Sequence, residues 1–266
     1  MTRLPTVLAA AAAATIAGAL GVTGQAGAQT AIPGDQTIRN VVLVHGAFAD
    51  ASGWRGVYDD LAARGYRVTL VQNPLTSLAD DVAATHRALN RLDGPAILVG
   101  HSWGGTVITE AGLHPNVAGL VYVSALSPDA GETTAQQYEG FTASPEFVLD
   151  VADDGYGFVA PDHFQTGFAH DVGDADAAFM RDSQVPINMD AFSTVLQHAA
   201  WRTRPSWAVI ATEDKAFSQA MLHHMAERIG ARVTEVSASH AVFMTQPAIV
   251  ARTIDEAARE ALASAD

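Results

Sequence analysis

Two patterns of apolar residues alternate along the chain from residue 38 to its end. Unbroken apolar runs, such as Val41-Val42-Leu43-Val44, are typical of parallel strands covered on both faces. Apolar residues that recur every three or four positions are typical of helices that bury one face. Strands are therefore expected at 38–44, 66–71, 96–98, 117–123, 206–211 and 232–236. Helices are expected through 54–61, from Ser77 to the stop at Gly94-Pro95, over 106–114, through 221–229 and after Pro247.

This alternation is interrupted between Ser127 and about Arg204. The segment is richer in Asp, Gly and aromatic residues, and it lacks clear strand runs. We expect a mostly helical cap, about 127–204, inserted between two strands of the sheet. Repeated strand–helix units with short links predict an α/β fold with a mainly parallel sheet and right-handed crossovers.

The first residues have the features of a secretory signal peptide. Met1-Thr2-Arg3 is a short basic start, residues 4–20 are apolar and rich in alanine, and Ala26-Gly27-Ala28 is a small-residue cleavage signal. The sequence predicts a signal peptide over 1–28, cut after Ala28, and one domain over 29–266. The mature protein is expected to be secreted or periplasmic, without stable membrane association.

Composition narrows the possible partners and chemistry. The chain has no cysteine, so neither a disulfide framework nor thiol chemistry is available to it. Its net charge of −14 argues against nucleic acid or an anionic membrane as a partner. The sequence carries no zinc-protease, dinucleotide or P-loop motif, so no metal or cofactor is expected. It leaves the oligomeric state open.

One motif carries clear chemistry. Gly100-His101-Ser102-Trp103-Gly104 follows an expected strand and precedes an expected helix, which is the context of a nucleophile elbow. The serine must occupy a tight turn between the two elements. The two glycines remove Cβ atoms that would collide where strand and helix approach closely.

Four stretches give the chain a family resemblance: 44–48 (VHGAF), 100–105 (GHSWGG), 211–215 (ATEDK) and 239–243 (SHAVF). The chain resembles the α/β-hydrolases from Val41 to its last helix. Within them it is most similar to the subfamily of small-ester methylesterases and hydroxynitrile lyases. The resemblance implies the α/β-hydrolase fold, with a mainly parallel sheet flanked by helices and an inserted cap.

Ser102 needs a base, because a free hydroxyl is a poor nucleophile near neutral pH. Among ten histidines, His240 alone follows the last expected strand directly, as the order Ser…Asp…His of this fold requires. His45 is expected to make a structural hydrogen bond, and His101 should point away from the nucleophile. His86, His114 and the adjacent pair 223–224 are expected on helices, the pair at a helix surface. The cap histidines, His163, His170 and His198, are expected to be exposed, with contact to the substrate as the alternative.

The acid should follow the strand at 206–211, where Glu213 and Asp214 are the carboxylates of the turn. The subfamily resemblance assigns it to Asp214, which would orient the imidazole and stabilise its cation, and leaves Glu213 as the alternative. Trp103, which follows the nucleophile, should supply one oxyanion N–H. The resemblance assigns the second to Ala47.

These residues predict a serine hydrolase that cleaves small to medium carboxylic esters through an acyl-enzyme on Ser102. Phe48 is expected to contact the bound small-molecule ester. Two alternatives stay open: a carbon–carbon lyase or other non-hydrolytic enzyme on the same scaffold, and a ligand-binding sensor. Hydroxynitrile lyases that resemble the chain carry a lysine after the catalytic histidine and a threonine in the oxyanion loop. Here Ala241 and Gly46 stand at those places.

Overall fold

The structure is a computed structural model that describes residues 37–262 of the 266 in the chain. The expected signal peptide, with its cleavage after Ala28, lies outside the described residues. Within 37–262, the helices are too short or too polar to span a lipid bilayer.

A six-stranded sheet forms the centre, and all its neighbouring strands run parallel. This confirms the expected α/β fold with a mainly parallel sheet. The strands β1, β3 and β8 are completely buried, in keeping with their unbroken apolar sequences. In order across the sheet the strands are β2 (Arg67–Val71), β1 (Asn40–Val44), β3 (Ala96–Ser102), β4 (Val117–Ala125), β8 (Ser206–Ala211) and β9 (Arg232–Val236).

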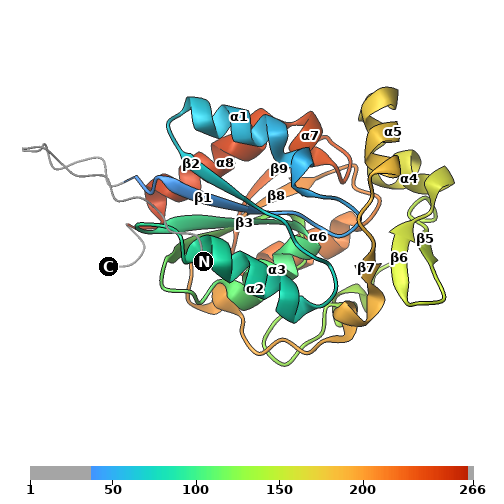
Figure 1. Cartoon of the computed structure of the whole chain (residues 1–266), viewed down its shortest axis with the longest axis horizontal. Coiled ribbons are helices and arrows are strands. Elements are labelled where there is room, and N and C mark those ends of the chain that lie inside the picture. The colour runs from blue at the N-terminus through green and yellow to red at the C-terminus, as the bar shows by residue number, and fades with distance from the viewer. Residues whose placement is uncertain (1–36, 263–266) are drawn as a thin grey trace, which may run out of the picture. The chain divides into compact units, whose positions relative to one another are not determined.

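Helices cover both faces of this sheet (Figure 1), with α1 and α8 packed together on one face and α2 and α3 packed together on the other. The short helix α7 leads into α8, and α6 packs on β8. The bounds are α1 (Arg55–Ala63, after the 3-10 turn Ala51–Trp54), α2 (Leu78–Leu89), α3 (Trp103–Ala111), α6 (Gln219–Arg228), α7 (Val242–Thr245) and α8 (Pro247–Glu260).

The expected bounds of α3 were wrong. The helix begins at Trp103 instead of residue 106 and ends at Ala111 instead of residue 114. The strand before it continues to Ser102, four residues beyond its expected end. Strand and helix therefore meet at the serine without a connecting loop. Periodicity could not detect this junction, because the glycines there interrupt the apolar pattern.

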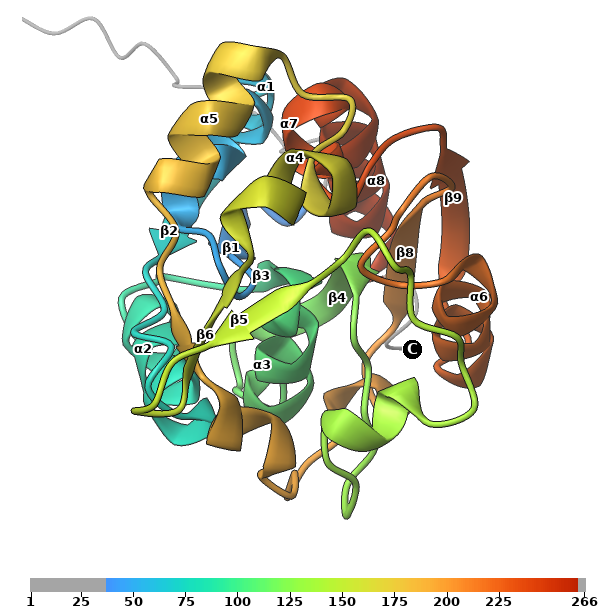
Figure 2. The same ribbon diagram turned by 90° about the vertical axis from the view of Figure 1, so that its right-hand side faces the viewer.

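The segment between β4 and β8 lies across the carboxyl ends of the central strands (Figure 2). It contains α4 (Pro161–Phe168), α5 (Asp174–Asp182) and 3-10 turns at Ala135–Tyr138, Met189–Ser193 and Ala200–Arg202. It also contains an antiparallel sheet of β5 (Leu149–Val151), β6 (Tyr156–Val159) and β7 (Ile187–Asn188).

The mostly helical cap expected from the sequence therefore also contains three strands that no clear apolar run had marked. The three strands are two to four residues long, too short for a period of two to be recognised. Leu149 and Val151 of β5 are also exposed, so no buried apolar run marks that strand. Helices nevertheless make up most of the regular structure of the segment.

The segment shares its apolar core with the sheet. Val159, Phe164, Phe168 and Ile187 are buried and belong to the same cluster as the strands β1, β3 and β4. The described residues form one compact unit. The cap thus rests on the main core and does not form a separate one.

Candidate active site

Ser102 occupies a strained turn between β3 and α3. Its φ of 53° lies in the left-handed region, which a residue with a side chain rarely adopts. The main-chain carbonyl of Ser102 accepts a hydrogen bond from Leu126 N–H at 3.2 Å. A Cβ built on Gly100 would collide with the carbonyl oxygen of Gly104 one turn later. Strand and helix can therefore meet this closely only because Gly100 has no side chain, as an elbow requires.

The loop after β1 lies directly against the nucleophile. A Cβ at Gly46 would come within 2.7 Å of Ser102 Cβ, so the backbone at this position passes beside the serine. The next residues, Ala47 and Phe48, line the same cavity as Ser102 and Trp103. Trp103 is the first residue of α3, and its N–H has no partner within the helix. The two segments that carry the expected oxyanion donors thus meet at the serine.

His45 holds this loop in place. Its Nε2 accepts a hydrogen bond from Asn73 N–H at 2.9 Å, so its Nδ1 carries the proton and donates to Gly46 O at 2.8 Å. The Asn73 amide donates in return to the His45 carbonyl at 2.9 Å. Burial lowers the pKa of His45, which favours the neutral ring that this pattern needs. The structural hydrogen bond expected for His45 is present.

His240 and Asp214 form a buried pair. His240 Nδ1 lies 2.7 Å from Asp214 Oδ2, and both side chains are almost completely inaccessible to solvent. The other carboxylate oxygen, Oδ1, accepts hydrogen bonds from Ala216 N–H at 2.8 Å and Phe217 N–H at 3.0 Å. These bonds fix the carboxylate, which in turn fixes the rotation of the imidazole.

Glu213 points elsewhere, although it precedes Asp214 in the same turn. Its carboxylate accepts a hydrogen bond from the Ser237 hydroxyl, at an exposed place on the rim of the sheet. Its backbone carbonyl accepts from His170 of the cap at 3.1 Å. The structure brings Asp214, and not Glu213, to His240.

His101 lies behind His240, and it is not among the residues that line the cavity. Its Nε2 donates to the His240 carbonyl at 2.9 Å, and the two rings are 4.6 Å apart between centroids. Burial and the neighbouring His240 lower the pKa of His101 well below its usual value. His101 therefore stays neutral and supports the loop of His240.

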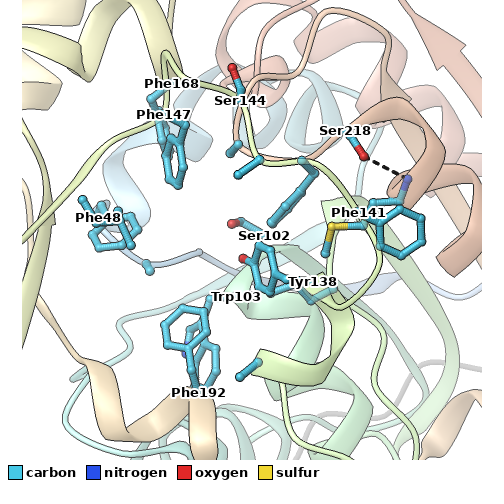
Figure 3. A pocket seen from close by; sticks show the side chains of 18 of the residues that line it. Phe48, Ser102, Trp103, Tyr138, Phe141, Ser144, Phe147, Phe168, Phe192 and Ser218 are labelled. Carbon is cyan, nitrogen blue, oxygen red and sulfur yellow. Dashed lines mark hydrogen bonds between the residues drawn. The ribbon is translucent and has the colours of Figure 1, made fainter.

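Among residues 37–262, no hydrogen bond joins the Ser102 hydroxyl to the His240 ring. The serine oxygen faces the cavity instead (Figure 3). Hydrogen bonds between a nucleophile and its base often become short only when substrate binds. The site therefore holds a preformed His–Asp pair and a serine that is open to a ligand.

The cavity above Ser102 has a volume of about 380 Å³ and walls rich in aromatic side chains (Figure 3). Trp103 packs against Phe192 of the cap, with ring centroids 5.0 Å apart. In the described part of the chain, no Lys, Arg, Asp or Glu lines this cavity. Its phenylalanines come from the oxyanion loop, the cap and the turn after Asp214: Phe48, Phe141, Phe147, Phe168, Phe192 and Phe217.

The sequence did not reveal a buried carboxylate beneath this wall. Asp81 accepts hydrogen bonds from the Trp103 indole at 2.7 Å and from Leu75 N–H at 2.8 Å. Burial raises the pKa of Asp81 to about 6, against the opposing effect of these two bonds. Asp81 lies three residues after Leu78, on the buried face of α2. An acidic residue on an apolar helical face was the signal that could have identified it.

The histidines of the cap (His163, His170 and His198) and the pair at 223–224 do not line the cavity above Ser102. His223 lies 3.8 Å from the Glu235 carboxylate at the surface, and the His224 ring packs near Phe141. Within the described range, no group of three or more His, Asp or Glu side chains is arranged to hold a metal ion.

Comparison with known proteins gives a consistent picture. The sequence model of the alpha/beta hydrolase family matches residues 41–253. The alpha/beta hydrolase nvfD of Aspergillus novofumigatus is 26% identical over 247 residues, which cover 84% of this chain and 97% of that protein. A pyrethroid hydrolase of Sphingobium wenxiniae is 36% identical over 110 residues, which cover 36% of this chain and 39% of that protein. The structure of polyneuridine aldehyde esterase has the same fold, with a TM-score of 0.72 at 18% identity over 82% of this chain and 98% of that one.

Proposed function

The chain belongs to the alpha/beta hydrolase family, and on this basis we propose that it is a secreted serine esterase for small to medium, largely apolar carboxylic esters. One observation carries the proposal. A buried His240–Asp214 pair packs against Phe168 and Phe217, and these two rings line the same uncharged cavity as the elbow serine Ser102.

In the proposed reaction, His240 takes the proton of the Ser102 hydroxyl as the oxygen attacks the ester carbonyl. The N–H groups of Ala47 and Trp103 stabilise the negative charge that develops on the carbonyl oxygen. His240 then gives its proton to the departing alcohol, and an acyl-enzyme on Ser102 remains. Water, activated by the same histidine, releases the acid. Asp214 keeps the proton of His240 on Nδ1 in the resting state, so that Nε2 is free to accept.

The chain does not favour the lyase alternative. The lyases that it resembles have a threonine where Gly46 stands, and here a side chain at this position would approach Ser102 Cβ to 2.7 Å. They also have a lysine after the catalytic histidine, where this chain has the fully buried Ala241. Burial of a charged side chain at this position would be costly. These differences support hydrolysis over cyanohydrin cleavage.

The walls of the cavity support an apolar substrate. Its volume of about 380 Å³ lies in the range of small-molecule sites, and aromatic side chains favour ligands with apolar or aromatic groups. The partial similarity to a pyrethroid hydrolase is compatible with such esters. With no cationic group in this wall, an acyl group that carries a carboxylate should bind poorly.

Labelling with a fluorophosphonate tests the proposal. The probe should react with Ser102, as mapped by peptide mass spectrometry, and labelled protein should lose hydrolysis of p-nitrophenyl butyrate in proportion. A control with Ser144→Ala, which changes a serine of the cap in the same cavity, should label normally. Labelling elsewhere, or full turnover by labelled protein, would contradict the mechanism and favour the sensor alternative.

Export is the second part of the proposal, and it rests on the features of residues 1–28. Expression of the full chain in a bacterial host, followed by N-terminal sequencing of the exported protein, tests it. A mature N-terminus at Gln29 is the expected result. Retention of Met1 in the cell interior would contradict it.

A further inference from the structure

Among the hydroxyl groups that the cap contributes to the cavity, that of Tyr138 belongs to an aromatic ring close to Ser102. Tyr138 ends the 3-10 turn Ala135–Tyr138 and lines the cavity together with Ser102. Figure 3 shows its ring beside the serine, with the hydroxyl end turned toward Ser102. Its ring lies 5.9 Å from that of Phe217, which in turn packs 4.9 Å from the His240 ring. Tyr138 thus approaches the site from the side of the His–Asp pair.

The Tyr138 hydroxyl has no hydrogen-bond partner among residues 37–262, and the side chain is partly buried at the wall of the cavity. Tyrosine hydroxyls in such places usually find a partner, because an unpaired polar group in an apolar site is unfavourable. Tyr122 in the core follows this rule, since its hydroxyl lies 2.9 Å from that of Thr109. An unpaired donor that faces a cavity is available to a ligand.

The Tyr138 phenol is protonated, so it can donate a hydrogen bond. Burial raises the pKa of its phenol, and the nearby charge of Asp214 raises it further. The group therefore keeps its proton at every pH at which the enzyme would work. It can donate a hydrogen bond, but it does not act as a base.

The position of the Tyr138 ring determines which oxygen of a bound ester its hydroxyl can reach. The carbonyl oxygen belongs with the proposed donors, the N–H groups of Trp103 and of Ala47, which directly precedes Phe48 in the chain. In the close-up, Phe48 and Tyr138 lie on opposite sides of Ser102 (Figure 3). The alcohol-side oxygen must face His240, which protonates it as the bond breaks. Tyr138 lies on that side.

We propose that the Tyr138 hydroxyl donates a hydrogen bond to the alcohol-side oxygen of the bound ester, next to His240, and assists its departure. This inference rests on the proposed esterase function. The bond from Ser102 Oγ to the carbonyl carbon forms, and the bond from that carbon to the alcohol oxygen breaks. The proton that His240 took from the serine passes to the departing oxygen. Tyr138 keeps its own proton and stabilises the partial negative charge on that oxygen before the transfer is complete.

The test compares leaving groups in the variant Tyr138→Phe, which removes the hydroxyl and keeps the ring against Phe217. The value of kcat/KM is measured for butyrate esters of p-nitrophenol, phenol and ethanol, since this parameter reports acylation alone. For the ethyl ester we expect a loss of about 10- to 50-fold, as for removal of one hydrogen bond to a developing charge. For the p-nitrophenyl ester, whose leaving group needs little assistance, the loss should stay within about 3-fold. An equal loss for all three esters would overturn the inference and indicate a merely structural role.

A change of one atom in the substrate gives a second test. Sulfur accepts hydrogen bonds weakly, so the loss seen with ethyl butyrate should nearly vanish with S-ethyl thiobutyrate. An undiminished loss with the thioester would count against the contact. Tyr58→Phe, at an exposed position on α1, is the matched control and should leave all rates unchanged.

The outcomes separate this inference from the proposed function. One outcome refutes the role of Tyr138 and leaves the esterase function intact. In this outcome the wild-type protein is labelled at Ser102 and hydrolyses the esters, and Tyr138→Phe depends on the leaving group as wild type does. Wild-type protein that is not labelled and hydrolyses none of the esters refutes the esterase function, and the inference with it.

Discussion

The junction of β3 and α3 and the cap over residues 127–204 are held by different forces. At the junction, the backbone itself fixes the geometry: β3 is fully buried, and the Gly100 backbone lies against that of Gly104. The cap rests on the main apolar core and is also held by polar side chains at its edges. Arg228 of α6 donates to Glu132 at 2.8 and 2.9 Å and to the Ser127 carbonyl at 2.7 Å.

A second set of polar contacts joins the cap to the loop of His240. Asp171, between α4 and α5, accepts from Ser239 N–H at 3.1 Å and from the Thr245 hydroxyl at 2.9 Å. The Phe168 carbonyl accepts from Ala241 N–H at 3.2 Å. The backbone therefore fixes the proposed nucleophile, while side-chain contacts hold the edges of the cap that forms part of the cavity wall. Reactive groups on a scaffold with variable loops around them are a common arrangement in proteins.

The strongest test of the rigid region removes the nucleophile. Ser102→Ala should lower kcat for p-nitrophenyl butyrate by about three to six orders of magnitude, because only the attacking hydroxyl is lost. Thermal unfolding should be almost unchanged, since the elbow depends on the backbone and on its glycines. A folded variant that keeps more than about a tenth of the wild-type rate would exclude Ser102 from the mechanism.

The next test concerns the acid. Asp214→Asn should lower kcat by about 10²- to 10⁴-fold, because the amide favours the wrong tautomer of His240. Glu213→Gln is the matched control in the same turn, and its kcat should change little. The reverse ranking of the two variants would transfer the role of the acid to Glu213.

Asp81 on α2 accepts a hydrogen bond from Trp103, which lines the cavity. The contribution of Asp81 to the stability of the folded protein should depend on pH. Its folded pKa of about 6 lies above the usual value of 3.8, because burial disfavours the charge. The stability that this shift provides is complete below about pH 4 and is lost as the pH rises through 6. Relative to Asp81→Asn, wild-type protein should therefore gain about 2 kcal/mol between pH 7 and pH 4.5.

Urea unfolding of both proteins at the two pH values measures this difference. Asp80→Asn serves as the control, because Asp80 is exposed and hydrogen bonds from Thr76 and Ser77 lower its pKa. Parallel pH dependence of wild type and Asp81→Asn would show that Asp81 does not titrate in the folded protein over this range.

The smallest effect is expected at the edge of the cap. Burial alone would raise the pKa of Asp171, yet hydrogen bonds from Ser239 and Thr245 outweigh it and hold the pKa below its usual value. Asp171→Ala removes these bonds and loosens the loop that carries His240. We expect kcat to fall by about 3- to 10-fold and the free energy of unfolding to fall by at most about 1 kcal/mol, since the carboxylate is exposed.

The matched control for this change is Asp182→Ala, which removes an exposed carboxylate of α5 that pairs with Arg181. Its kcat should equal that of wild type. If Asp171→Ala also keeps the full rate, the cap does not position His240 through this contact.

The sequence alone predicted most of the central sheet and the turn that carries Ser102. Completely buried parallel strands need unbroken apolar runs, so β1, β3 and β8 could be read directly from the pattern. The edge strands β2 and β9 are largely exposed and were placed from the alternation of strands and helices along the chain. The elbow was also readable, because its two glycines and its serine have fixed spacing for steric reasons. The order of Ser102, Asp214 and His240 followed from the order of the strands that precede them.

Contacts between residues that lie far apart in the sequence became known only from the tertiary structure. The family resemblance favoured Asp214 as the acid but left Glu213 as the alternative. Only the structure shows that Asp214 contacts His240, because the direction of each side chain in a turn depends on what packs around it. The burial of Asp81 beneath Trp103 and the unpaired Tyr138 hydroxyl in the cavity are likewise properties of packed surroundings. The short strands of the cap could not be predicted because they bury little apolar surface. A strand is recognised in a sequence only when buried apolar residues recur over several positions.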